Sequence, residues 1–527
     1  MSRVEPNQSM AAAKRSHTLR VEPPITRRGE SGYKDTCTSH LTSKPLSEST
    51  SLTRRGMLNR ISLGFGGLAL HSMLASATPA NELPNPLTPL KPHFAPRAKS
   101  VVFLFMQGGV SHVDTFDEKP ALTKYDGQPP PFKRTRVQFG KRGNLMRSPW
   151  TFRCTGESGL PMSSLWQHLP DVADDLCMIH SVCDTNVAHG GATMKLHTGH
   201  EALVRPSLGS WISYGLGTEN QNLPSFINIC PSSIHGGVNN WGSAFLPSIH
   251  QGVPLGTPGY PNVQAAKARF KYMDLSGNAK LQRMQLNLLR KLTFESEPTE
   301  AELEARIQTF ELAFRMQMAA PGALDLSTET KETQKLYGMD NEQTEDFGRQ
   351  CLLARRFIER GVRFIQVNHA GNLRSLGVPT NEQWDQHGYL EKGHSINAAQ
   401  VDRPMTGFIQ DLKARGLLDD TLIVWGGEFG RTPTVQAGQS GKNVGRDHHT
   451  DGFTMWMAGG GVKGGFRYGE TDEFGYYTIR DRMTIHDLHA TILHLMGLDH
   501  TRLTHRHAGR DFRLTDVYGN VAHDLFA

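Results

Sequence analysis

One short stretch of the sequence places an acidic side chain directly after a run of apolar residues. The run, LIVW, has the character of a β-strand buried on both faces, and it ends in two glycines followed by Glu428. Further along the chain, Asp447 precedes His448 and His449. Carboxylates and imidazoles that converge from two loops are the ligands that a divalent metal ion requires. The alternative is an ion pair between Glu428 and Arg431, with the two histidines in a polar loop.

Acidic and imidazole side chains also follow the other segments that we expect to be strands. These are His112 and Asp114 after 100–106, His189 after 176–180, and Asp385 and His387 after 363–368. Ligands in open α/β sheets bind beyond the carboxyl ends of the strands, so these side chains are expected to share one edge. A lone histidine is usually structural, but several strand ends that carry Asp, Glu or His predict a site for one or two divalent metal ions.

The elements that would position these side chains alternate along the chain. The apolar segments named above, and another at 453–458, have the length and composition of buried strands. Helical periodicity lies between them, and helices are expected at 165–174, at 345–360, before Gly416 and from Thr484 to Gly497. Strands that alternate with helices imply a mostly parallel sheet covered on both faces. We therefore predict an α/β fold, a doubly wound α/β/α sandwich, with a helical insertion at about 263–338.

Length, charge and cysteine content limit the class of protein. The chain has 527 residues, enough for one large α/β domain with insertions or for two domains. Residues 1–77 hold 11 Lys/Arg and 5 Asp/Glu, and the remainder holds 46 of each, so the net charge of +6 belongs to the N-terminal part. The balance elsewhere gives no support for nucleic-acid binding. No C-x-x-C pair is present, and Cys177 and Cys183 are expected either to form a disulfide or to remain buried thiols.

The N-terminal part has the order of an export signal. Residues 53–58 (TRRGML) contain a twin-arginine pair, a Gly-rich and weakly apolar run follows, and Ala75-Ser76-Ala77 is an A-x-A cleavage signal. The alternative is a chance arginine pair before a buried helix. We predict a disordered basic leader at 1–52, a signal peptide at 53–77, a Pro-rich linker at 78–98 and a domain at 99–527. The expected partner is the twin-arginine export machinery, and the expected location is periplasmic or secreted, without a stable membrane span after cleavage.

The order of these motifs resembles that of the alkaline phosphatase superfamily, which includes sulfatases, phosphodiesterases and cofactor-independent phosphoglycerate mutases. Residues 417–422 (LLDDTL) resemble the family's turn and strand, and 427–430 (GEFG) stand at its Ser-Asp-His-Gly tetrad. By this likeness Glu428 falls on a metal-binding Asp, and Phe429 replaces the second ligand. Residues 487–511 resemble the closing helix and turn of the sulfatases.

The resemblance also assigns roles at the other strand ends. Asp385 and His387 fall near the family's Asp-x-x-x-His metal pair, and His449 falls on its late His ligand. Gln107 stands where the family has its first metal-binding Asp, a role that Asp114 could take over. The position of the sulfatase nucleophile holds His189 in place of Cys, Ser or Thr.

Residues 99–527 as a whole are most similar to a narrower branch, the twin-arginine-exported bacterial proteins of the domain of unknown function 1501 (DUF1501) family. The shared motifs are Gly108-Gly109, Ser111-His112, Trp384-Asp385 with His387, Gly427-Glu428-Phe429-Gly430-Arg431-Thr432-Pro433 and Gly445-Arg446-Asp447-His448. This likeness identifies the family, but a fold does not settle a function.

The resemblance implies an exported, metal-dependent hydrolase of sulfate or phosphate esters, with a small-molecule or polysaccharide ester as substrate. The expected metal ligands are Asp114, Asp385, His387, Glu428, Asp447, His448 and His449. His189 would attack the sulfur or phosphorus centre or act as the base for a water molecule. Arg431 or Lys195 would neutralise developing anionic charge. The alternative is a non-catalytic envelope binding or scaffold protein, which Gln107, Phe429 and the missing nucleophile favour.

Overall fold

The computed structural model describes residues 87–527, apart from 133–141, 261, 272–278, 295–300, 371–375, 379–382, 437 and 439. The predicted leader, the signal peptide and the first part of the linker lie outside the described residues. Within the described part of the chain, none of the helices combines the length and the apolar character that crossing a bilayer requires.

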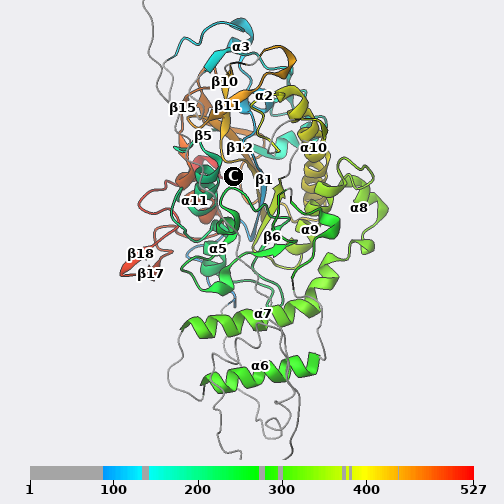
Figure 1. Ribbon diagram of the computed structural model, residues 1–527, viewed down its shortest axis with the longest axis vertical. Coiled ribbons are helices and arrows are strands. Elements are labelled where there is room, and N and C mark those ends of the chain that lie inside the picture. Colours follow the sequence, from blue (N-terminus) through cyan, green and yellow to red (C-terminus); the bar gives the residue numbers. More distant parts are fainter. Residues whose placement is uncertain are drawn as a thin grey trace, which may run out of the picture. The chain divides into compact units, whose positions relative to one another are not determined.

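A nine-stranded sheet forms the centre of the described domain (Figure 1). Its order is β13-β5-β12-β9-β1-β8-β6-β7, and β16 also pairs with β5. The strands are β1 Ser100–Met106, β5 Leu176–Cys183, β6 Phe226–Ile229, β7 Val253–Leu255, β8 Phe364–His369, β9 Thr421–Gly426, β12 Phe453–Ala458, β13 Phe466–Tyr468 and β16 Met483–Thr484. The predicted, mostly parallel sheet is confirmed, because β1 pairs parallel with β8 and β9, and β6 pairs parallel with β7 and β8.

Strand β12 runs antiparallel to both of its neighbours, β5 and β9. Its first residue, Phe453, therefore lies at the edge of the sheet where the parallel strands end. The segment that precedes it, β11 Arg446–His449, pairs with β10 Gly430–Gln436, and β10 also pairs with β2 Arg142–Leu145. This small antiparallel sheet brings the Asp-His-His segment to the same edge as Glu428. The two histidines therefore belong to a strand, β11, and not to a loop.

Helices cover both faces of the central sheet, as the alternating pattern predicted. Side chains alternate along β1, so that Val101 and Phe103 face one apolar core and Val102 and Leu104 face the other. Figure 1 shows α5 and α11 on one side of the sheet and α9 and α10 on the other. The helices are α4 His189–Thr198, α5 Leu208–Leu216, α9 Glu345–Ile358, α10 Leu390–Ala414 and α11 Ile485–Leu495. The capping box between Thr484 and Asp487 explains why α11 begins where the sequence predicted.

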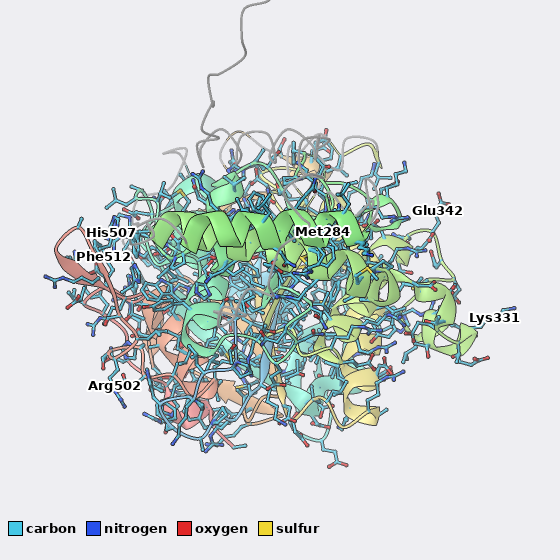
Figure 2. The ribbon with its side chains drawn as sticks, turned by 90° about the horizontal axis from the view of Figure 1, so that it is seen from below. Met284, Lys331, Glu342, Arg502, His507 and Phe512 are labelled. Atoms are coloured by element: carbon cyan, nitrogen blue, oxygen red, sulfur yellow. The ribbon has the colours of Figure 1, made fainter. Side chains whose placement is uncertain are left out.

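The segment that was expected to be a helical insertion contains three α-helices among its described residues. They are α6 Ala279–Phe294, α7 Ala301–Leu324 and α8 Lys331–Leu336. Figure 2 looks at α6 from below, with Met284 marking this helix. Buried residues of α7, Leu312 and Met316 among them, belong to the same apolar core as α9 and α10, so α7 packs onto the helical layer of the sandwich.

One local expectation differs from the structure, and one open alternative is decided by it. The helix expected at 165–174 is a short 3₁₀ segment, Leu169–Asp175, with Val172 outside helical geometry. Pro170 at its start and the absence of a side-chain cap explain why a longer α-helix does not form. Cys177 and Cys183 are both free and buried, so the alternative of buried thiols is correct and the disulfide is not formed.

Candidate metal centre

Four connections of the sheet meet at the edge where its parallel strands end. After β9 comes Glu428, after β8 comes the segment with Asp385 and His387, and after β5 comes a loop that leads to His189, the first residue of α4. The antiparallel direction of β12 adds His448 from β11. The topology thus gathers side chains from four distant parts of the sequence.

One carboxylate oxygen lies at the centre of three imidazoles. Asp385 Oδ1 lies 3.4 Å from Nε2 of His189, 3.1 Å from Nε2 of His387 and 3.2 Å from Nε2 of His448. The Nε2 atoms of His387 and His448 are themselves 2.9 Å apart. These four distances are close to the spacing between ligand atoms around a tetrahedral ion, which is roughly 3.3 Å for metal–ligand bonds of about 2.0–2.1 Å.

The second nitrogen of each imidazole has an oxygen partner. Nδ1 of His189 lies 2.6 Å from Glu428 Oε1, and Nδ1 of His448 lies 2.7 Å from the Val187 carbonyl oxygen. Nδ1 of His387 contacts the side-chain oxygen of Gln436. Since an oxygen acceptor requires a proton on Nδ1, each of the three Nε2 atoms is assigned a lone pair that points toward Asp385. With this assignment three lone pairs face a carboxylate, an arrangement that a cation between them would stabilise, so the residues present fit a bound metal ion.

Glu428 is a fully buried carboxylate that orients His189. It also accepts a hydrogen bond of 3.0 Å from the backbone N–H of Gly108. Burial would raise the pKa of Glu428, but the hydrogen bond from His189 and the other contacts of the carboxylate outweigh burial and hold the pKa below its usual value. Gly108 is required here, because a Cβ on it would lie 2.7 Å from the backbone nitrogen of Asp385, and its φ is +115°.

Arg431 is the ion-pair partner of Asp385 and not of Glu428. Its Nη2 lies 2.7 Å from Asp385 Oδ1, and its other donors bind the carbonyl oxygens of Gly109, Trp384 and Arg446. Burial alone would raise the pKa of Asp385, but Arg431 and the surrounding imidazoles hold it far below its usual value. The alternative of an ion pair between Glu428 and Arg431 is therefore wrong.

A family model described as a protein of unknown function (DUF1501) matches residues 98–526. The chain belongs to the DUF1501 family. None of the curated proteins matches the DUF1501 chain.

Several solved structures are similar to the DUF1501 chain at low identity. The lipoteichoic acid synthase LtaP from Listeria monocytogenes is 9% identical with a TM-score of 0.33, covering 80% of this chain and 76% of that one. The alkaline phosphatase from the Antarctic bacterium TAB5 is 9% identical with a TM-score of 0.29, covering 76% of this chain and 98% of that one. A protein in the alkaline phosphatase superfamily from Vibrio parahaemolyticus is 10% identical with a TM-score of 0.30, covering 85% of this chain and 76% of that one. Values this low say nothing about the reaction of the DUF1501 chain.

Two groups of side chains in the DUF1501 protein have the spacing of metal ligands. One is His189, Asp385 and His448, and the other is His387, Asp447 and His448. Asp447 lies behind the centre, where its Oδ1 accepts a 2.8 Å hydrogen bond from the backbone N–H of His448 and lies 3.8 Å from Nδ1 of His387. His448 is common to both groups.

The structure places three other predicted residues elsewhere. Asp114 forms a buried ion pair with Arg446, with contacts of 2.7 and 3.0 Å. Lys195 binds Asp184 at 2.5 Å, and both residues line a separate pocket. His449 neighbours His448 but points away from Asp385.

His449 and His112 share a separate polar cluster. Nε2 of His449 lies 2.5 Å from the carbonyl oxygen of Tyr476, and Nε2 of His112 lies 2.8 Å from that of Gly475. Their rings stack on each other. Consecutive residues of a strand point to opposite sides, which is why His448 faces the centre and His449 does not.

Two aromatic neighbours of the centre were not assigned to it from the sequence. Phe429 packs against the rings of His189 and His448, with ring centroids 4.8 and 4.4 Å away. It therefore supports the two imidazoles and is not itself a ligand. His235 lies 4.9 Å from the ring of His189. No sequence signal pointed to His235, because it belongs to a loop without periodicity.

Proposed function

We propose that this DUF1501 protein is an exported, metal-dependent hydrolase of phosphate or sulfate esters. The observation that carries the proposal is the set of three imidazole Nε2 atoms around Asp385 Oδ1. The motifs shared with the alkaline phosphatase superfamily support the substrate class.

His189, Asp385 and His448 would hold the ion. The carboxylate of Glu428 behind His189 and the carbonyl of Val187 behind His448 are the partners that commonly orient metal-binding histidines. Because Nδ1 of His448 is committed to Val187, its Nε2 can serve only one ion, so we infer one ion per chain. When bound, a divalent ion polarises an ester oxygen and lowers the pKa of water.

His387 would act as the general base. Its side chain is 21% exposed, against 10% for His189 and 2% for His448, so solvent reaches it more easily than the other two imidazoles. Gln436 holds its Nδ1, and Nε2 faces Asp385 and His448, where it would take a proton from an attacking water beside the ion. Arg431 is a positioning residue here, because its donors are committed to Asp385 and to backbone carbonyls.

The experiment compares two glutamine variants of the purified mature protein. Metal content is measured by elemental analysis, and turnover is measured with aryl phosphate and aryl sulfate esters. His189→Gln should lose the ion, whereas His387→Gln should keep it and lose turnover by roughly 10²–10⁴-fold. His507→Gln is the matched control, because His507 is an exposed histidine of the β17–β18 hairpin, His505–His507 and Arg510–Phe512 (Figure 2). Far less than one ion per chain in the unaltered protein would refute the proposal.

One observation favours a second candidate, a scaffold protein with a structural ion. His387 Nε2 lies 3.1 Å from Asp385 Oδ1 and 2.9 Å from Nε2 of His448, two of the proposed ligands, so it would be a further protein ligand, and metal sites closed by four protein ligands are usually structural. This candidate predicts that chelation lowers the melting temperature while none of the esters is hydrolysed. It also predicts that His387→Gln, and not only His189→Gln, weakens metal binding.

A further inference from the structure

A second pocket, with a volume of about 630 Å³, lies apart from the metal centre. Four segments of the chain form it: the end of β5, the middle of α4, the segment 482–487 at the start of α11, and residues 517–520. None of its described lining residues is one of the groups around Asp385. Its volume falls in the range of sites that bind small molecules, which is roughly 300–1,000 Å³.

Arg482 provides this pocket with a cation whose outer donors are free. Strand β16 pairs parallel with β5 and places Thr484 opposite Cys183, which brings Arg482 beside the thiol. Nε of Arg482 donates a 3.0 Å hydrogen bond to Sγ of Cys183. Among the described residues, its two Nη groups have neither a hydrogen-bond partner nor an ion-pair partner. A guanidinium held at Nε offers its Nη groups as a fork of donors, which suits the oxygens of a carboxylate or a phosphate.

The two carboxylates that line the pocket already have partners of their own. Asp184 is buried and forms an ion pair of 2.5 Å with Lys195, so its charge is neutralised inside the protein. Asp487 accepts hydrogen bonds from the backbone and hydroxyl of Thr484 and from the backbone and side-chain amide of Asn520. The charge of the guanidinium is therefore left for a ligand.

An aromatic ring lines the same pocket. Tyr518 is 61% exposed, and its ring stacks on that of His486 with the centroids 5.1 Å apart and an angle of 29°. Nε2 of His486 lies 2.8 Å from the carbonyl oxygen of Gly199, which fixes the orientation of the lower ring. Because His486 covers one face of Tyr518 and the residue is mostly exposed, the other face is open. The apolar face of a ligand ring packs well on such a surface.

We propose that this pocket binds a sugar-sized molecule that carries a carboxylate, phosphate or sulfate group, with Arg482 on the anionic group and Tyr518 against the ring. The inference goes beyond the proposed function, because the pocket is separate from the metal centre and its ligand need not be hydrolysed there. The volume suits a small organic molecule better than a bare ion. A hydrogen bond to a charged group corresponds to about a ten- to hundredfold change in affinity.

The test is a calorimetric titration of the metal-loaded protein with glucuronate and with inorganic sulfate, neither of which is an ester that turnover would consume. Arg482→Gln should weaken glucuronate binding about ten- to hundredfold, with an unchanged melting temperature because the residue is exposed. Arg482→Lys should lie between the two, since it keeps the charge but loses the fork. Tyr518→Ala should weaken the binding of glucuronate and leave that of sulfate unchanged. Arg480→Gln is the matched control, because Arg480 is a nearby exposed arginine that pairs with Glu470.

The outcomes also separate this pocket from the metal centre, where an anion would bind as well. The titration is therefore repeated in His189→Gln, which the proposed function expects to lack the ion. Glucuronate binding that persists there supports the inference, and its loss would place the anion at the ion and overturn it. Equal affinity in Arg482→Gln and Arg480→Gln, or no glucuronate binding to the unaltered protein at millimolar concentration, would overturn it too. Unchanged glucuronate affinity in Tyr518→Ala would overturn the choice of a ring-bearing ligand. Failure of the hydrolase proposal leaves these results untouched, since none of them measures turnover.

Discussion

Glu428 Oε1 lies 2.6 Å from Nδ1 of His189, inside the protein where solvent does not reach the carboxylate. This contact fixes the proton of His189 on Nδ1 and turns Nε2 toward Asp385. A carboxylate behind a histidine in this way also makes the imidazole a stronger ligand. Glu428 therefore acts on the proposed ion through His189, although the sequence suggested that Glu428 itself would be a ligand.

The first prediction concerns this carboxylate. Glu428→Gln keeps an oxygen that can accept from His189 and from Gly108, but it removes the negative charge. Metal affinity should fall about 10- to 100-fold, because outer partners of metal-binding histidines have effects of that size. The measurement is a competition titration with a chromophoric chelator. Glu391→Gln on the exposed start of α10 is the control, and equal affinity in both variants would show that Glu428 has no such role.

The second prediction separates a structural ion pair from a metal ligand. Asp114 and Arg446 are both fully buried, and Asp114→Asn leaves the guanidinium without its charged partner. The free energy of unfolding should fall by about 3–5 kcal/mol in urea denaturation, with one ion per chain retained in the folded protein. The double variant Asp114→Asn/Arg446→Met should recover part of this loss. Metal loss at unchanged stability would instead make Asp114 a ligand.

The third prediction is a loss of stability in mild acid. Burial lowers the pKa of four histidines away from the metal centre from 6.5 to about 4: His180, His197, His250 and His369. Between these two values the unfolded chain binds more protons than the folded one, so stability falls as pH falls from about 7 toward 4. Each such histidine contributes a slope of about 1.4 kcal/mol per pH unit.

Urea midpoints measured at pH 7.0, 6.0 and 5.0 test this slope. In His250→Gln the slope of the unfolding free energy against pH should be smaller by the contribution of one histidine, about 1.4 kcal/mol per pH unit, because Gln is not protonated in either state. Stability that is constant over this range would show that the buried histidines do not remain neutral in the folded protein.

The fourth prediction concerns export, which lies outside the described residues. Changing Arg54 and Arg55 to Lys keeps the charge but removes the planar guanidinium groups that a receptor can bind in a bidentate way. Uncleaved precursor should then accumulate in the cytoplasm, as cell fractionation would detect. Arg27 and Arg28 give a matched control, because they stand in the same Thr-Arg-Arg-Gly context without the apolar run that follows. Normal processing of the Arg54/Arg55 variant would make the pair incidental.

The sequence alone determined the kind of fold, the family and the edge of the sheet where the centre lies. Buried strands appear as short apolar runs, and a polar residue that closely follows such a run must lie near a strand end, as Glu428 does after β9. These features depend on the local pattern of apolar and polar residues, which can be recognised in the sequence without knowing which distant residues are in contact. The alternation of strands and helices also predicted a mostly parallel sheet, although it did not say which strands lie beside β1.

Only the tertiary structure decided which of these side chains meet. The antiparallel direction of β12 brings β11 to the shared edge, and its pairing with β10 turns His448 inward and His449 outward. Arg431 reaches Asp385, and Arg446 reaches Asp114, because each contact joins segments that are far apart in the chain. The sequence shows which residues lie near a strand end, but the direction of each side chain depends on register and packing. A one-residue change of register would exchange His448 for His449 at the centre.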